Sequence, residues 1–253
     1  MNMKSSPPIN IKLIQGLSLI SQKELSEFVF FSTSKYFSGQ RSYSNILKIL
    51  KALHKSGFKG HDNNSILGLL MKELELSKNT LQNRISELYK IFEMFIVIRE
   101  LKYLPFERNR ILMNYYSQKN SFKLFDYVYN SVFEFQKKEK VSSERMKRDY
   151  SLYDLSSTNY FFRGNSKSYT EHFSLKSDYQ IYAFLIDLLK NGIEIHQQNF
   201  MSLKHNSRLP EKVIENLPVN VILKELKKSN TQYYYLIMIV YEMYLSFGDY
   251  SVS

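Results

Sequence analysis

The feature that most constrains this chain is the spacing of its apolar residues, which recur every three to four positions along most of its length. One uninterrupted example is Leu81, Ile85, Leu88, Phe92 and Phe95, which would form a single stripe along a helix. The alternation of apolar and polar residues that marks a half-buried strand is nowhere sustained. With 43% hydrophobic residues, the chain has ample surface to bury and is not expected to be disordered. The sequence therefore predicts an all-α fold.

Residues that favour helix ends predict several boundaries in the first half. Ser21 and Glu24 have the spacing of a capping box, in which each side chain binds the other residue's free backbone N–H. Gly57 is suited to end a helix in the left-handed conformation. Pro105 is suited to the first turn of a helix, so the long helix before it should end there. Met94–Glu100 is rich in β-branched residues, and we interpret it as the buried end of that long helix.

The second half shows similar signals. A helix is expected over Ser142–Phe162, and Gly164–Tyr169 is the most loop-like segment of this region. A further helix is expected over Ser177–Lys190, with Gly192 after its end. The final helix should run to about Phe247.

Short links between amphipathic helices favour an irregular array of antiparallel helical hairpins, similar to an α-solenoid, although the spacing of known repeats is absent. The segment Lys137–Arg148 holds six basic and two acidic residues and is the best candidate for a domain boundary. We therefore expect a basic helical domain over residues 1–140 and an aromatic-rich helical hairpin region over residues 141–253. A solvated junction between two helices would have the same composition as this boundary segment.

The formal net charge is +11, with 35 Lys and Arg against 24 Asp and Glu. Part of this excess can come from nucleotide bias, because Lys, Asn, Ile, Tyr and Phe, all encoded by A/T-rich codons, are abundant together. The distribution is more informative than the total, since residues 1–110 carry a net charge of +8 and residues 191–253 a net charge of zero. An anionic partner would therefore bind the N-terminal part.

Residues 69–90 resemble the helix-turn-helix segment of bacterial regulators. The resemblance depends on an apolar first helix, a Leu76-Ser77 turn, and Leu81, Ile85 and Leu88 on the inner side of the second helix. Amide side chains suit adenine edges and cations suit phosphates. The candidate contacts with duplex DNA are Lys78, Asn79, Gln82, Asn83, Arg84, Ser86 and Lys90.

Three features count against this interpretation. Glu75 lies at the turn position where such motifs commonly have Gly, and Glu87 would lie close to phosphates. The second helix is also predicted to continue well beyond Leu88. An ordinary amphipathic hairpin with a Ser-capped turn would have the same pattern.

Catalytic and metal-binding patterns are weak. The chain has no Cys, which excludes disulfides and Cys-ligated zinc, and it has no glycine-rich phosphate loop or nucleophile elbow. The five histidines lack metal-ligand spacing, and we expect each at the surface or at an interface: His54, His61, His172, His196 and His205. We therefore expect no enzyme activity, cofactor, metal or small-molecule substrate.

Aromatic residues gather in the second half of the chain, and at helical spacing they are expected in the core or between hairpins. Three consecutive tyrosines, Tyr233, Tyr234 and Tyr235, cannot all face inward. At least one must be exposed or contact another surface, so these residues are a candidate partner surface.

Leu19–Phe28, Ser34–Phe37, Thr80–Lys102 and Tyr182–Lys190 resemble an uncharacterised bacterial family of long, all-helical hypothetical proteins. The resemblance implies a helical array and no assigned activity, and it transfers no functional residues. Members of that family are longer, so it also implies that this chain is a truncated or partial one.

These patterns favour a non-enzymatic helical scaffold that binds another protein. The alternative is a DNA-binding regulator that acts through residues 69–90. The most apolar segment, Tyr233–Leu245, is too short to span a bilayer and the N-terminus lacks a signal peptide, so we expect no membrane partner and a cytoplasmic location.

Overall fold

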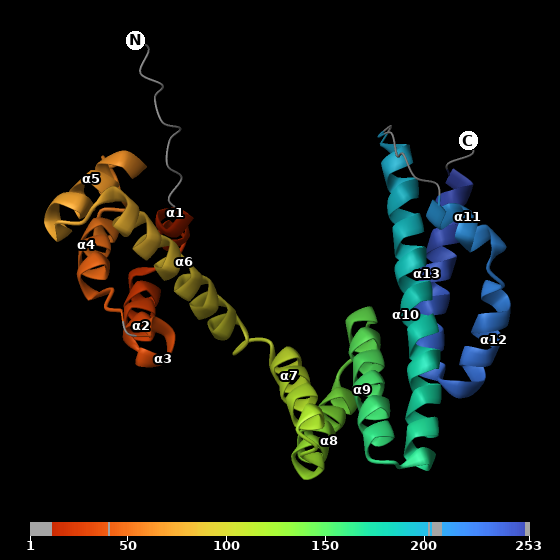
Figure 1. Cartoon of the computed structure of the whole chain (residues 1–253). Coiled ribbons are helices and arrows are strands. Elements are labelled where there is room, and N and C mark those ends of the chain that lie inside the picture. The colour runs from red at the N-terminus through yellow and green to blue at the C-terminus, as the bar shows by residue number, and fades with distance from the viewer. Residues whose placement is uncertain (1–11, 40, 202, 204–208, 251–253) are drawn as a thin grey trace. The chain divides into compact units, whose positions relative to one another are not determined.

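A computed structural model describes residues 12–39, 41–201, 203 and 209–250 of the chain. The described residues form thirteen helices and no strands, which confirms the all-α class (Figure 1). They divide into two compact units, residues 1–104 and 105–253. The division lies at Leu104–Pro105, whereas the sequence placed it at residues 140 and 141. The basic segment Lys137–Arg148 lies inside unit 2, where it joins two packed helices, as a solvated junction would.

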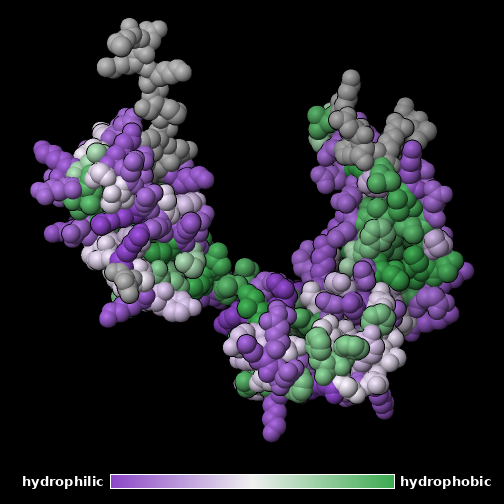
Figure 2. All heavy atoms as spheres, viewed as in Figure 1, coloured by the Kyte–Doolittle hydropathy of each residue, from purple (hydrophilic) through white to green (hydrophobic). Residues whose placement is uncertain are grey.

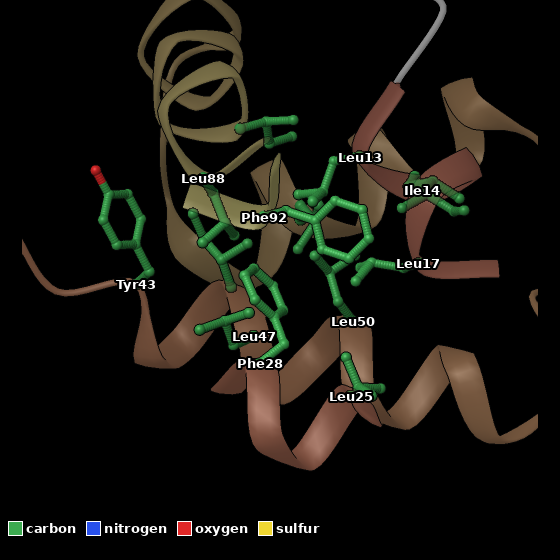
Figure 3. Close-up of a cluster of buried hydrophobic side chains, with 14 of the residues drawn as sticks. Leu13, Ile14, Leu17, Leu25, Phe28, Tyr43, Leu47, Leu50, Leu88 and Phe92 are labelled. Carbon is green, nitrogen blue, oxygen red and sulfur yellow. The ribbon is translucent and has the colours of Figure 1, made fainter. Parts of the chain in front are cut away.

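Unit 1 contains six helices around one apolar core. They are α1 (Lys12–Ser18), α2 (Gln22–Thr33), α3 (Lys35–Ser38), α4 (Ser44–Lys55), α5 (Asn63–Leu74) and α6 (Lys78–Glu100). Figure 3 shows Phe28 of α2 and Phe92 of α6 at the centre of this core, where their rings meet edge to face with centroids 5.2 Å apart. Helix α1 lies against α6 at Gly16, where an added Cβ would come within 2.6 Å of the Phe92 ring.

The ends of the helices in unit 1 follow the predicted signals. Ser21 and Glu24 form the capping box at the start of α2. After α4, Gly57 has a φ of +64°, and its N–H and that of Phe58 donate to the carbonyls of His54 and Leu53. This pair of bonds satisfies carbonyls that the end of a helix leaves free.

The second half of α6 differs from the expectation. The segment is helical, but Met94, Val97 and Ile98 are exposed to between 43% and 58%, while Phe95 is buried. The prediction that Met94–Glu100 is buried was therefore wrong. In unit 1, α1 and α2 cover one side of α6 and leave these three side chains on another.

Unit 2 contains seven helices, packed mainly as neighbours in sequence. They are α7 (Pro105–Gln118), α8 (Phe122–Lys138), α9 (Ser143–Phe162), α10 (Ser166–Phe200), α11 (Leu209–Asn216), α12 (Val219–Ser229) and α13 (Thr231–Tyr250). Helices α9 and α10 form a hairpin, and α10 also packs against α11 and α13 (Figure 1). The predicted start at Ser142 and stop at Gly164 of α9 are confirmed, because Ser142 caps its first turn and Gly164 has a φ of +68°. The α-solenoid-like arrangement stays a prediction.

Helix α10 is one uninterrupted helix of 35 residues, which corrects two expectations. Gly164–Tyr169 is not a loop, since Asn165 caps α10 and the helix begins at Ser166. Gly192 does not end a helix. It lies within α10 because α11 and α13 approach closely there, and an added Cβ would lie 2.6 Å from Tyr244 and 2.9 Å from Ile214. Across the residues that the structure describes, no helix is both long and apolar enough to cross a membrane.

Candidate nucleic-acid interface

The segment that resembles a helix-turn-helix consists of α5, a three-residue turn and the first half of α6. Asp62 caps α5 by accepting from the N–H of Ser65 at 2.8 Å. Glu75 then takes the left-handed conformation, with φ 51° and ψ 37°. Ser77 caps α6 by accepting from the N–H of Thr80 at 3.3 Å. The turn therefore has the left-handed residue that Gly commonly supplies, although the residue here is Glu.

The inner side of α6 packs as predicted. Leu81, Ile85 and Leu88 are at most 7% exposed. They share the core of unit 1 with Leu47 and Leu50 of α4 and with Ile66, Leu67 and Leu70 of α5. Helices α4, α5 and α6 thus enclose one apolar centre, which fixes the direction in which the outer side of α6 faces.

The predicted DNA-contacting residues lie on the outer side of the first half of α6. Lys78, Asn79, Asn83, Ser86 and Lys90 are exposed, and Gln82 and Arg84 are half-buried. None of the seven is buried beneath the described helices of unit 1. We call these seven residues the α6 stripe.

Glu87, which appeared unfavourable for DNA contact, has partners within unit 1. The guanidinium of Arg41 forms an ion pair with its carboxylate, and the hydroxyl of Tyr43 donates to Oε2 at 2.9 Å. The hydrogen bond from Arg41 lowers the pKa of Glu87 below its ordinary value. This contact compensates the negative charge at the border of the α6 stripe and ties the loop before α4 to α6.

A groove of about 560 Å³ lies beside the turn and separates α4 from the turn and the start of α6. Its lining includes Arg41, Asn45 and Arg84, together with the carboxylates of Glu73 and Glu75. Residues 1–104 carry fifteen Lys and Arg and eight Asp and Glu, and the interval between Glu27 and Asp62 contains six cations and no acid. Unit 1 therefore has the charge that attracts polyanions.

The three consecutive tyrosines of α13 separate in the structure. Tyr233 is 2% exposed and belongs to the core of unit 2, so its assignment to a partner surface was wrong. Tyr234 is half-buried and Tyr235 is 52% exposed. Tyr235, Ile239 and Met243 follow one another on the outer side of α13, and Figure 2 shows apolar side chains gathered over the C-terminal helices.

Sequence analysis missed a polar cluster in the interior of unit 2. Asp149 of α9 is 8% exposed, and its Oδ2 accepts from the hydroxyl of Tyr233 at 2.5 Å. Burial raises the pKa of Asp149 above its ordinary value. Its nearest cation is Arg145, whose Nε lies 3.8 Å from Oδ2. The only signal was the spacing of Arg145 and Asp149, four residues apart, which is typical of surface pairs on a helix.

The histidines do not form a site. His54 is buried, contrary to expectation, because its Nε2 lies 2.9 Å from the carbonyls of Leu17 and Ile20. Since carbonyl oxygens only accept, Nε2 carries the proton and satisfies the end of α1. His172 lies among tyrosines of unit 2, His196 is half-buried against Tyr244, His61 is exposed, and His205 lies outside the described residues. Within the part of the chain that the structure describes, no three His, Asp or Glu residues gather to hold a metal ion.

The fold defines an all-α protein with a helix-turn-helix-like segment in unit 1. Comparison of the chain with protein-family models, with curated proteins and with solved structures finds no match. The resemblance to a bacterial family of helical proteins therefore stays an expectation.

Proposed function

We propose that unit 1 binds duplex DNA and that the α6 stripe contacts its major groove. The observation that carries the proposal is that three amides, a serine and three cations, none of them buried, lie on the second helix of a helix-turn-helix-like segment whose two helices are capped at their starts. Sequence analysis alone favoured a protein-binding scaffold. The exposure of most of the stripe and the pairing of Glu87 with Arg41 support the DNA-binding alternative.

The chemistry of the α6 stripe suits both parts of DNA recognition. Asn79, Gln82 and Asn83 offer paired donors and acceptors, which match the major-groove edge of adenine. Lys78 and Arg84 flank these amides and suit phosphates. The first turn of α6 adds free backbone N–H groups and the positive end of the helix dipole. Together these groups would provide sequence preference and general affinity.

The length of α6 is compatible with this role. Residues 78–90 span roughly 20 Å at 1.5 Å per residue, and this interval holds the whole α6 stripe. Between Met94 and Ile98 the exposed side chains are apolar. The helix thus changes from a polar face to an apolar face after the interval proposed to lie in the groove, and the remaining turns need no DNA contact.

The proposal is tested by fluorescence anisotropy of the full chain with labelled duplex DNA at increasing salt. We expect binding at low salt that weakens steeply as salt rises, because cations on the protein displace counterions from phosphates. The double variant Lys78→Glu and Arg84→Glu should weaken binding strongly and reduce the slope of log K against log salt by about two. Asn79→Ala with Asn83→Ala should reduce discrimination between A/T-rich and G/C-rich duplexes more than total affinity.

The matched control is Lys212→Glu with Lys224→Glu, which reverses two exposed cations of unit 2. This variant has the same net charge as the α6 double variant and should bind DNA nearly as the natural chain does. Equal losses in the two variants would mean that bulk charge, and not the α6 stripe, accounts for binding. Absence of binding at low salt would refute the proposal.

A second candidate function is protein binding through the outer side of α13. Tyr235, Ile239 and Met243 are about half exposed, and the charged side chain nearest to them on this helix is Glu242. An exposed apolar stripe of this kind fits the apolar face of a helix from another protein. A purified partner that binds the natural chain but not Ile239→Asp would support this function, and a partner that binds both equally would count against it.

A further inference from the structure

A small, partly open cavity with both polar and apolar walls lies in unit 2, among α8, α9 and α10. Its volume is about 170 Å³, which is room for several water molecules or one molecule of a few heavy atoms. Three aromatic side chains, Phe133, Tyr153 and Tyr179, form part of its wall. The polar and charged groups that line it are Gln136, Lys137, Arg145, Asp149, Tyr153 and Tyr179.

Gln136 is the most unusual of these residues. Its side chain is 2% exposed, and neither its amide nitrogen nor its amide oxygen has a hydrogen-bond partner in the protein. A buried amide without partners is costly, so such a group normally binds something else. It offers two donors and one acceptor.

The charges around the cavity are also incompletely paired. The Nε of Arg145 has no hydrogen-bond partner and lies 3.8 Å from Oδ2 of Asp149, beyond hydrogen-bond distance. The other end of this guanidinium donates to the carbonyl of Glu139 at 2.5 Å, which fixes its position. Asp149 is held in the same way by the hydroxyl of Tyr233. A fixed cation and a fixed anion thus face one space, and each retains unused bonding capacity.

We propose that this cavity binds a small zwitterion of the α-amino acid class. The carboxylate would accept from Arg145 and from the amide nitrogen of Gln136, and the ammonium would donate to Asp149 and to the amide oxygen of Gln136. The short spacing between the two charges of an α-amino acid matches the short spacing between Arg145 and Asp149. The volume of about 170 Å³ suits an amino acid with a small side chain.

Other simple ligands match the walls less well. A ligand with only a negative charge would offer no positive group to the carboxylate of Asp149. A ligand with only a positive charge would offer no negative group to Arg145 and would be repelled by Arg145 and Lys137. Lys137 pairs with Glu134 at 2.8 Å and lies over the ring of Phe133, so it contributes a positive field at the edge and not a fixed contact. The walls therefore favour a ligand with both charges.

The test is isothermal titration of the full chain with glycine, L-alanine and L-serine. Because ligands of so few atoms make few contacts, we expect affinity in the millimolar range or somewhat tighter. Acetate and methylammonium, which each carry one half of the zwitterion, should bind at least tenfold more weakly than L-alanine. Equal binding of acetate and L-alanine would refute recognition of a zwitterion, and absence of binding by all three amino acids would mean that the cavity holds water only.

Variants assign the binding to this cavity. Gln136→Leu replaces the unpartnered amide with an apolar group of similar size, so it should fold at least as stably as the natural chain and lose amino acid binding. Asp149→Asn should lower the affinity for L-alanine about tenfold while changing that for acetate little. The matched control is Gln180→Leu at an exposed position of α10, which should bind as the natural chain does. Unchanged binding by Gln136→Leu would place the ligand elsewhere and overturn the proposal.

Discussion

The two units bury different kinds of side chain. Among the described residues of unit 1, the buried polar side chains are Ser32 and His54, and each bonds to backbone carbonyls nearby. Unit 2 buries more polar side chains: Ser117, Gln136, Ser143, Asp149, Ser156, Ser157 and Asn159. Several of them bond across helices, as Asn159 does to Ser117 and Asp149 does to Tyr233. Unit 1 therefore has an apolar interior with its polar chemistry outside, whereas unit 2 has part of its polar chemistry inside.

Because of this difference, the candidate sites of the two units lie in different places. In unit 1, the side chains proposed to bind DNA lie on the outer side of α6, where a large polyanion could reach them. In unit 2, Gln136 and Arg145 retain unused hydrogen-bonding capacity beside a cavity of about 170 Å³, a volume that suits a small molecule. The two proposals concern ligands of different size for this reason.

The largest expected effect tests the apolar interior of unit 1. Phe28 is fully buried between Phe92 and Phe95, so Phe28→Ala should lower the free energy of unfolding by about 3–5 kcal/mol. Hydrogen-exchange mass spectrometry of the full chain should show loss of protection in residues 12–104. The matched control is Phe30→Ala, two residues further along α2, where the side chain is 84% exposed and the effect should be small. Equal losses in both variants would contradict the assignment of the core.

The next effect tests the polar interior of unit 2. Tyr233→Phe removes the hydroxyl that donates to Asp149 and leaves that carboxylate with Arg145 at 3.8 Å, so unit 2 should lose about 1–3 kcal/mol of stability. Tyr235→Phe removes the hydroxyl of an exposed neighbour and should change stability by less than about 0.5 kcal/mol. Urea unfolding measures both. A loss below that of the control would mean that the bond to Asp149 contributes little.

Sequence periodicity predicted the apolar interior well because burial of one helix face imposes a spacing that can be counted. Leu81, Ile85 and Leu88 lie where the pattern placed them, and Ser21, Ser77 and Ser142 cap the predicted helices. A cap is a bond between residues two or three positions apart, so it can be predicted from the local sequence without the rest of the fold.

The failures of sequence analysis depend on partners that are distant in the chain. Gly192 resembles a helix stop, but its real role is to admit Tyr244 and Ile214. Asp149 and Arg145 resemble a surface pair, but Tyr233, which lies 84 residues further along the chain, draws Asp149 into the interior. His54 was expected at the surface, but its Nε2 binds the carbonyls of Leu17 and Ile20 at the end of α1. Contacts of this kind leave no periodic signal.

A smaller effect tests the turn of the helix-turn-helix. Glu75 has a left-handed conformation that costs a residue with a Cβ roughly 1–2 kcal/mol, so Glu75→Gly should stabilise unit 1 by about 1 kcal/mol and leave DNA binding intact. Glu73→Gly, within the last turn of α5, should instead destabilise unit 1 by up to about 1 kcal/mol. Changes of opposite sign in the free energy of unfolding, from the same substitution at two positions, would confirm the left-handed conformation of Glu75. A destabilising Glu75→Gly would contradict it.

The smallest effect is a difference in acid sensitivity between the units. In unit 1, hydrogen bonds lower the pKa of Glu24, Asp62 and Glu87. The main donor is the backbone N–H of Ser21 for Glu24, the backbone N–H of Ser65 for Asp62 and the side chain of Arg41 for Glu87. A carboxyl with a lowered pKa stabilises the folded state above its unfolded pKa, near 4, and this stabilisation is lost as the pH falls through the folded pKa. Asp62 is exposed and Glu24 and Glu87 are only half-buried, so solvent screens all three and each contributes little.

In unit 2, Asp149 acts in the opposite direction. Burial raises its pKa, so its contribution to stability is greatest below its ordinary value of 3.8 and declines as the pH rises through its folded pKa. Acidification should therefore weaken unit 1 more than unit 2, because Asp149 offsets part of the loss from Glu134 and Glu144, whose pKa values are lowered. Hydrogen exchange between pH 3 and 6, corrected for the intrinsic exchange rate, would measure both units together. Asp149→Asn should make unit 2 more sensitive to acid, and Glu87→Gln should make unit 1 less sensitive to acid. If Asp149→Asn leaves the acid sensitivity of unit 2 unchanged, the buried carboxyl does not titrate as its burial implies.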